Sequence, residues 1–140
     1  MAAIVRYVNV NSAAGGDGTT DATAGANRAY SSQNEMEAAE QTNLVAAGDT
    51  FTGICAGGAD TAIVAYSGWT TGVSNDILIT ATTDMHSGVF DNTKYYLAAG
   101  TGSAAYLTIS EEFVSIIGLQ FERDTPVSAS LARPTISWSG

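Results

Sequence analysis

The sequence has little of what several large protein classes require. Its only cysteine, Cys55, cannot form a disulfide within the chain, and its place in the apolar run FTGICAG predicts a buried structural thiol. Lys and Arg number five against fourteen Asp and Glu, which gives a net charge of −9. Binding to nucleic acid or to an anionic membrane needs clustered basic side chains, so we expect neither as a partner.

Long apolar runs are also missing. None approaches the roughly 18 residues that a transmembrane helix needs. The opening residues, MAAIVRYVNVN, lack the basic segment and the continuous apolar segment of a signal peptide. We therefore expect a chain without a signal peptide that is synthesised in a cytoplasm.

The 140 residues are 45% hydrophobic and only 14% charged, with Gly, Ala, Ser and Thr filling the balance. The length and hydrophobic content predict a single domain over residues 1–140 with its own core. The shortage of charge predicts a β-rich fold with many turns. We expect an N-terminal strand, loop and capping helix over residues 1–48, followed by strand-built coils over residues 49–140.

The N-terminal part has clear local signals. Residues 4–10, IVRYVNV, alternate like a short strand, and residues 11–29 form a Gly-rich loop. Ser32 and Glu35 have the spacing of a capping box, which predicts the start of a helix, and Gly48 predicts its end. GGDGTTD in the loop lacks the spacing and the tandem copies of a calcium-binding repeat, which favours a tight turn.

The run FVSIIGLQF, residues 113 to 121, predicts a corner. Val114 and Ile116 share one face of a strand, whereas Leu119 and Phe121 share a face of opposite parity. A structural corner at Gly118 would flip the parity and turn both pairs inward. The other β-type runs after residue 49 are short and have no amphipathic helices between them. Parallel strands normally need helical crossovers, but a solenoid does not, because each coil returns a strand beside its predecessor.

Candidate catalytic residues are few. His86 lies between two aspartates in TTDMHSGVFD, but no second His exists to complete a zinc site. Glu122 and Asp124 share a strand face, and glycoside hydrolysis needs a carboxylate pair. A solvated rim explains these charges as well, and no basic residue clusters with them. We therefore expect no catalytic residue, no metal and no cofactor.

Several of these motifs occur together in one known family. The run YLTISEEFVSIIGLQF resembles a coil of the pectate-lyase-like right-handed parallel β-helix superfamily. The upstream order is similar too: a Tyr-Val strand, GGDGTT, a capped helix and AAGDTFTGICAG. The resemblance implies an all-β fold, a short right-handed parallel β-helix (β-solenoid) with an N-terminal capping α-helix.

The same resemblance, with the Gly, Ala, Ser and Thr content, is to virion-associated proteins of tailed phages. It implies a non-enzymatic structural or decoration component of the capsid surface, tail or fibre, located in the virion after synthesis in the host cytoplasm. One alternative is the N-terminal part of a carbohydrate-binding or carbohydrate-cleaving β-helix protein such as a tailspike. Another is a β-sandwich adhesion or decoration module.

The C-terminal run LARPTISWSG predicts an interface. Pro134 cannot donate a ladder hydrogen bond and so suits a strand start or edge. Ile136 and Trp138 share one face of the extended segment, and Leu131 precedes them. An apolar strand edge left in water is an aggregation hazard, so we expect these residues to dock on another subunit. The expected partners are a homo-oligomer or neighbouring virion proteins, with surface polysaccharide as a further candidate.

Overall fold

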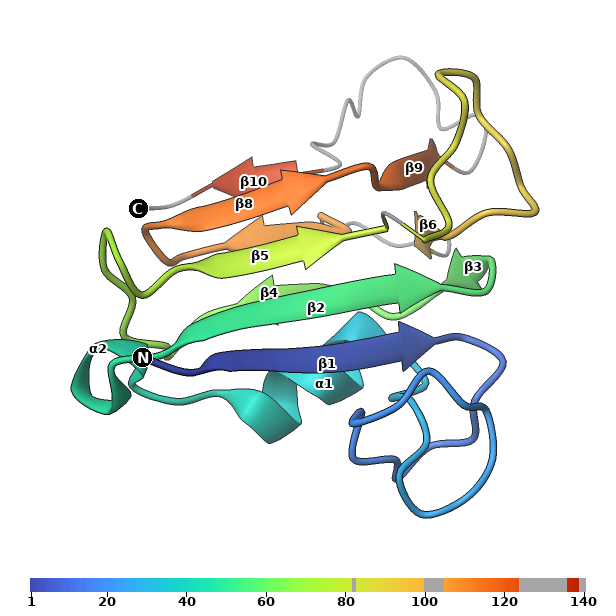
Figure 1. The fold of residues 1–140 in the computed structure, drawn as a ribbon. Helices are drawn as coiled ribbons and strands as arrows, with labels where there is room; N and C mark the ends of the chain where they lie inside the picture. Colours follow the sequence, from blue (N-terminus) through green and yellow to red (C-terminus); the bar gives the residue numbers. More distant parts are fainter. Residues whose placement is uncertain (82, 100–104, 124–135, 139–140) are drawn as a thin grey trace.

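The structure, a computed structural model, describes residues 1–81, 83–99, 105–123 and 136–138. These residues form ten strands and two helices (Figure 1). In chain order they are β1 (Ala3–Asn9), α1 (Gln33–Glu40), α2 (Leu44–Ala47), β2 (Thr50–Ala56), β3 (Ala59–Asp60), β4 (Val64–Tyr66), β5 (Ile77–Thr80), β6 (Tyr96–Ala99), β7 (Leu107–Ile109), β8 (Val114–Ile117), β9 (Gln120–Arg123) and β10 (Ile136–Trp138).

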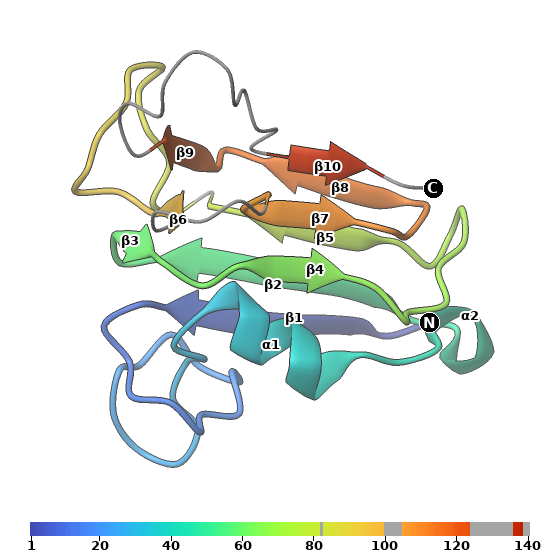
Figure 2. The ribbon, with the colours of Figure 1, turned by 180° about the vertical axis from the view of Figure 1, so that it is seen from behind.

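The strands form three parallel sheets. Sheet A has the order β1-β2-β5-β8, sheet B the order β4-β7-β10 and sheet C the order β3-β6-β9. Figures 1 and 2 show sheets A and B from their two sides, with β8, β9 and β10 together at one end of the molecule. Helix α1 lies at the opposite end, beside β1 and β4.

The predicted fold class, an all-β closed β-solenoid, is wrong. The described residues form three separate short sheets and two helices, a mixed α/β fold without a closed solenoid. Strands as short as the two residues of β3 are joined by irregular segments instead of uniform corners. Helix α1 is part of the core, because Met36 is fully buried against β2, where a Cβ on Gly53 would lie 2.7 Å from the Met36 Cε.

The predicted start of the helix is confirmed. The Ser32 hydroxyl oxygen accepts a hydrogen bond from the Glu35 N–H at 3.1 Å. The Glu35 carboxylate reaches back and accepts from the Ser31 N–H at 2.7 Å. One of the N–H groups that the first helical turn leaves without partners, that of Glu35, is therefore satisfied by a side chain, and the Ser31 N–H just before the cap is satisfied by another.

The predicted single helix up to Gly48 is two helices. The Leu44 N–H donates to the Thr70 carbonyl at 3.0 Å, which draws the chain out of the helical path between α1 and α2. Asn43 then caps α2, accepting from the Ala46 N–H at 2.8 Å. Gly48 ends α2 with a φ of +72°, a left-handed conformation that glycine adopts without strain.

The core lies between the sheets and α1. Cys55 is fully buried, as predicted, and burial raises the pKa of its thiol. The inward side chains of sheet A stack in register across the strands, with Phe51, Ile77 and Val114 forming one row. Other fully buried large apolar side chains of the core include Met36, Leu44, Val64, Tyr66, Ile79, Tyr95, Leu97, Leu107 and Ile109.

Gly118 lies between β8 and β9 with a φ of +75°. Leu119, just beyond it, is buried, and Phe121 packs against the core from β9. Val114 and Ile116 pack against the same core from β8, so residues of both parities contact it.

Candidate assembly site at the open strand edges

The chain itself closes one end of sheet A. The N–H groups of Tyr7 and Asn9 on β1 donate to the carbonyls of Gly18 and Tyr30 at 2.9 and 2.8 Å, and the Tyr30 N–H donates to Tyr7 at 2.9 Å. Gly18 is buried, and a Cβ there would lie 2.4 Å from the Tyr30 ring. The loop of residues 11–29 therefore occupies the outer edge of β1.

Side chains fix this loop against α1. The Arg28 guanidinium donates to three loop carbonyls, of Ala13, Ala14 and Gly25. The Tyr30 hydroxyl donates to the Glu40 carboxylate at 2.7 Å, and burial together with that carboxylate raises the pKa of Tyr30. The closed end is therefore held by the loop and the helix jointly.

A buried polar network joins α1 to sheets B and C. The Tyr66 hydroxyl donates to Gln33 Oε1 at 2.9 Å, and Gln33 Nε2 donates to the Tyr95 hydroxyl at 2.9 Å. The Tyr95 hydroxyl and the Gln33 N–H both donate to Asp60 Oδ2 at 2.8 Å. Burial raises the pKa of both tyrosines well above the ordinary value, so both remain donors. The network fixes the N-terminus of α1 over the closed end.

Within the described residues, the opposite end of the sheets is open. None of the described residues pairs with the outer edges of β8, β9 and β10 (Figures 1 and 2). The carbonyls of Phe113 and Ile117 accept from β5 and from Ala81 just after it, at 3.0 and 3.1 Å. Successive residues of a parallel strand direct their backbone groups to opposite edges, so Val114 and Ile116 direct theirs outward.

Two apolar rows of sheet B run from the core to this open end. Ile136 and Trp138 on β10 are 43% and 58% exposed, whereas Leu107 and Ile109 on β7 beneath them are 0% and 1% exposed. The buried rows thus continue into β10, where Ile136 and Trp138 are about half exposed to solvent. From the closed to the open end, the rows are Val64, Leu107 and Ile136, and Tyr66, Ile109 and Trp138.

Strand β8 and the residue before it carry further exposed apolar side chains. Phe113 and Ile117, just before and at the end of the strand, are both exposed. Phe113 has a φ of +53° and is the only non-glycine residue with a positive φ in the described part of the chain. A bulky side chain in this conformation stores about 1–3 kcal/mol of strain, and such strain concentrates at functional sites.

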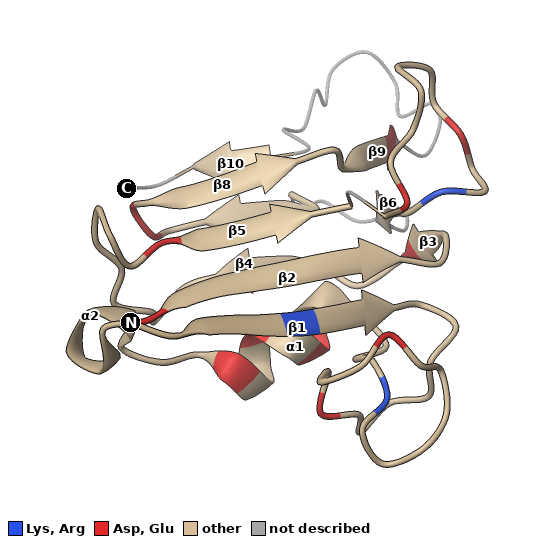
Figure 3. Cartoon of the chain, in the orientation of Figure 1, with Lys and Arg blue, Asp and Glu red and all other residues tan. Residues whose placement is uncertain are grey.

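The edge strands differ in charge. Strands β8 (VSII) and β10 (ISW) contain no charged residue, whereas β9 (QFER) carries Glu122, which is exposed. Figure 3 shows that acidic residues lie mainly in loops and on α1. Soluble proteins commonly guard edge strands with charged side chains. Strand β9 is guarded in this way, and β8 and β10 are not.

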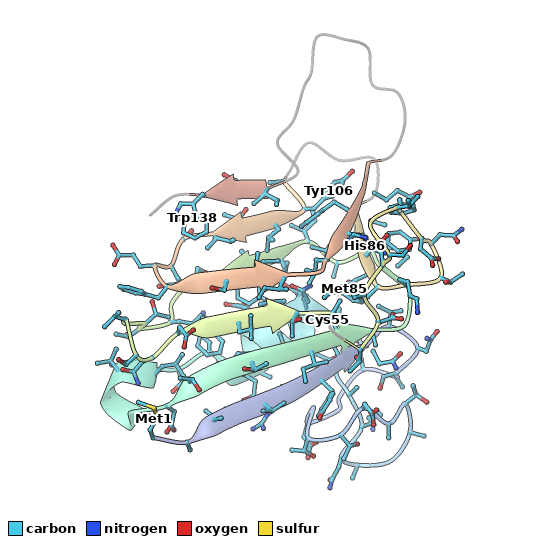
Figure 4. All side chains as sticks on the ribbon, turned by 45° about the horizontal axis from the view of Figure 1, so that its top comes forward. Met1, Cys55, Met85, His86, Tyr106 and Trp138 are labelled. Atoms are coloured by element: carbon cyan, nitrogen blue, oxygen red, sulfur yellow. The ribbon has the colours of Figure 1, made fainter. Side chains whose placement is uncertain are left out.

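Two of the four predicted interface residues can be placed. Ile136 and Trp138 lie along one face of β10, and Figure 4 shows Trp138 at the end of the molecule that carries the last strands. Leu131 and Pro134 lie outside the described residues. The sequence interpretation missed Phe113 and Ile117. Their side chains have the opposite parity to Val114 and Ile116, which pack against the core, so they lie on the outer face of sheet A.

The candidate catalytic residues that the structure describes, His86 and Glu122, do not form a reaction site. The His86 Nδ1 accepts from the Gly88 N–H at 2.9 Å within its own loop, away from Trp138 in Figure 4. Glu122 is exposed on β9, and Asp124 lies outside the described residues. Among the residues that the structure places, no three or more His, Cys, Asp or Glu side chains are grouped so as to hold a metal. In that same part, no helix has the length and apolarity to cross a membrane.

Comparisons with protein-family models, with curated proteins and with solved structures find no match to this chain. The resemblance to the pectate-lyase-like superfamily therefore stays a prediction from the residues.

Proposed function

We propose that the chain is a non-enzymatic structural component of a tailed-phage virion, which assembles through the open edges of β8 and β10. The observation that carries the proposal is the continuation of two buried rows into Ile136 and Trp138, which are half exposed. Complete burial of a large apolar side chain contributes about 2 kcal/mol, so covering the exposed parts of Ile136 and Trp138 would favour docking. The virion setting itself comes from the family resemblance of the residues.

Strand edges suit assembly better than they suit catalysis. An added strand gains main-chain hydrogen bonds along the whole edge, and alternate side chains fix its register. The described charged groups serve the fold: Glu35 caps α1, and Asp84 accepts from the N–H groups of Gly57 and Tyr95 at 3.0 and 2.8 Å. These charged groups therefore need no catalytic role to explain their positions.

The assembly part of the proposal is tested on particles of the phage that encodes the chain. Gradient-purified virions should contain its peptides in stoichiometric amounts by mass spectrometry. The variant Trp138→Lys should be lost from the particles, whereas Val45→Lys should be retained. Val45 is an exposed apolar residue on α2, which lies at the end of the molecule that carries β1 (Figure 1), so it is a matched control. Absence of the wild-type chain from the particles would overturn the proposal.

The non-enzymatic part is tested with polysaccharides. Incubation with pectin, alginate and bacterial capsular polysaccharides should release no new reducing ends and no unsaturated uronate absorbance. Turnover that disappears in Glu122→Gln would instead support a carbohydrate-cleaving protein.

A further inference from the structure

The asymmetry between the two ends of the sheets determines which partner the open edges can take. We propose that the partner is a second copy of this chain, joined edge to edge about a two-fold axis into a closed dimer. The proposal rests on the proposed function, because it names the partner of the same strand edges.

The closed end disfavours a head-to-tail arrangement. The outer edge of β1 is bonded to Gly18 and Tyr30 at Tyr7 and Asn9, and α1 packs beside β1 and β4. A head-to-tail arrangement would therefore place an open edge against an end that is already partly covered, whereas the open end of another copy offers strands that no described residue pairs with. Two such ends meet as the same surface on both subunits, an isologous contact that closes at two.

Charge favours the same partner. The chain carries a net charge of −9, and like charges placed opposite each other across paired strands are destabilising. Strands β8 and β10 carry no charge, so two copies can bring these strands together without that cost. Strand β9 carries two charged residues, Arg123 and the exposed Glu122, and pairing this strand would place charged groups in the contact. We therefore assign the contact to β8 and β10 and exclude β9.

The directions of the strands are compatible with two-fold symmetry. Strands β8 and β10 run in opposite directions on the two sides of the molecule (Figures 1 and 2). The strands of each sheet follow one another along a single direction, from the closed end to the open end. A two-fold axis perpendicular to that direction sets β8 antiparallel either to β8 or to β10 of the second copy. Both settings give antiparallel pairs and place Ile136 and Trp138 beside core-facing apolar side chains of β8 or β10 in the second copy. Aromatic and β-branched pairs across strands are favourable contacts.

Light scattering of the full chain after size-exclusion chromatography tests the dimer. The wild type should have twice the monomer mass of 14.3 kDa. Ile136→Lys and Trp138→Lys should each raise the dissociation constant by about 30-fold or more, the effect of a residue central to an interface. Val45→Lys, compared with the wild type at about 300 mM NaCl where salt screens the added charge, should leave the constant unchanged. Circular dichroism melts show whether each variant is folded.

Tryptophan fluorescence of the unaltered chain gives a second measurement that does not depend on the edge variants. Trp69 is buried within one copy, whereas Trp138 is exposed until the edges meet. Emission should therefore shift to shorter wavelength as the concentration rises into the dimer range, at the midpoint that scattering gives. A wavelength that is constant through dimerisation would overturn the assignment to β10.

The outcomes separate this inference from the proposed function. A monomer at all concentrations, an open series of larger oligomers, or a dimer indifferent to both edge substitutions would overturn the inference. A monomer that still enters virions and is lost as Trp138→Lys would overturn only the second copy as partner. A dimer that is absent from virions would support this inference and overturn the proposed function.

Discussion

At the scale of single residues, two residues with a left-handed backbone conformation flank β8, and they differ in the conformational strain that this conformation imposes. Gly118 has a φ of +75°, which glycine adopts freely, whereas Phe113 holds a φ of +53° with a bulky side chain. The first follows from the sequence, because a glycine between two runs of opposite parity indicates a corner. The second has no signal in the sequence, because nothing local requires a phenylalanine to adopt that conformation.

Replacing Gly118 by valine should lower the free energy of unfolding by about 1–3 kcal/mol. The main cause is the left-handed backbone, which a β-branched residue adopts only with strain. A Cβ would also lie 2.7 Å from the Met85 Cε, but that is the end of a flexible side chain and can move. Urea unfolding followed by circular dichroism measures the change.

The matched control is Gly118→Asn, because asparagine tolerates the left-handed region better than other non-glycine residues. It adds the same Cβ contact with Met85 but less backbone strain, so it should cost less than valine. Equal losses in the two variants would assign the cost to the Met85 contact and contradict the backbone explanation.

At the scale of elements, helix α1 shows which features a sequence can reveal. Its start was predictable, because Ser32 and Glu35 are three positions apart and act within one turn. Its end was not, because the chain leaves the helical path toward Thr70, which is distant in sequence. The fold class was wrong for a similar reason. Short β-type runs are visible locally, but their closure into coils depends on the irregular segments between them.

The candidate site likewise contains residues that local sequence predicts and residues that only the long-range pairing of strands reveals. Ile136 and Trp138 were predicted from their two-residue spacing, which is local. The unpaired backbone edge at Val114 and Ile116 depends on β8 being the last described strand of sheet A, which only the pairing with β5 establishes. The polar network around Gln33 also joins three segments that are far apart in the chain and leaves no local pattern.

Replacing Gln33 by leucine should destabilise the protein by about 2–4 kcal/mol, because it leaves the buried Tyr66 hydroxyl without its acceptor and removes a donor to Tyr95. The neighbouring substitution Asn34→Leu is the control, since Asn34 is exposed on the same helix. Thermal melts of the two variants measure the difference. A Gln33→Leu protein as stable as Asn34→Leu would show that the network does not hold α1 in place.

At the scale of the whole molecule, net charge opposes the self-association that the open edges favour. Two copies bring net charges of −9 into proximity, while the strands that meet are uncharged. The repulsion is therefore long-range and acts between surfaces beyond the contact. Salt screens such repulsion, since the Debye length falls to about 8 Å at physiological ionic strength.

Raising NaCl from about 20 mM to about 300 mM should therefore tighten the dimer, lowering its dissociation constant by about 3- to 10-fold. Light scattering across a dilution series at each salt concentration measures the constant. The control is Val45→Lys, which adds a positive charge on α2, at the end of the molecule that carries β1: its dimer should be tighter than the wild type at low salt and should approach it at high salt. An interface held by ion pairs would respond in the opposite direction, so a dimer that weakens with salt would place the contact on charged surfaces and away from β8 and β10.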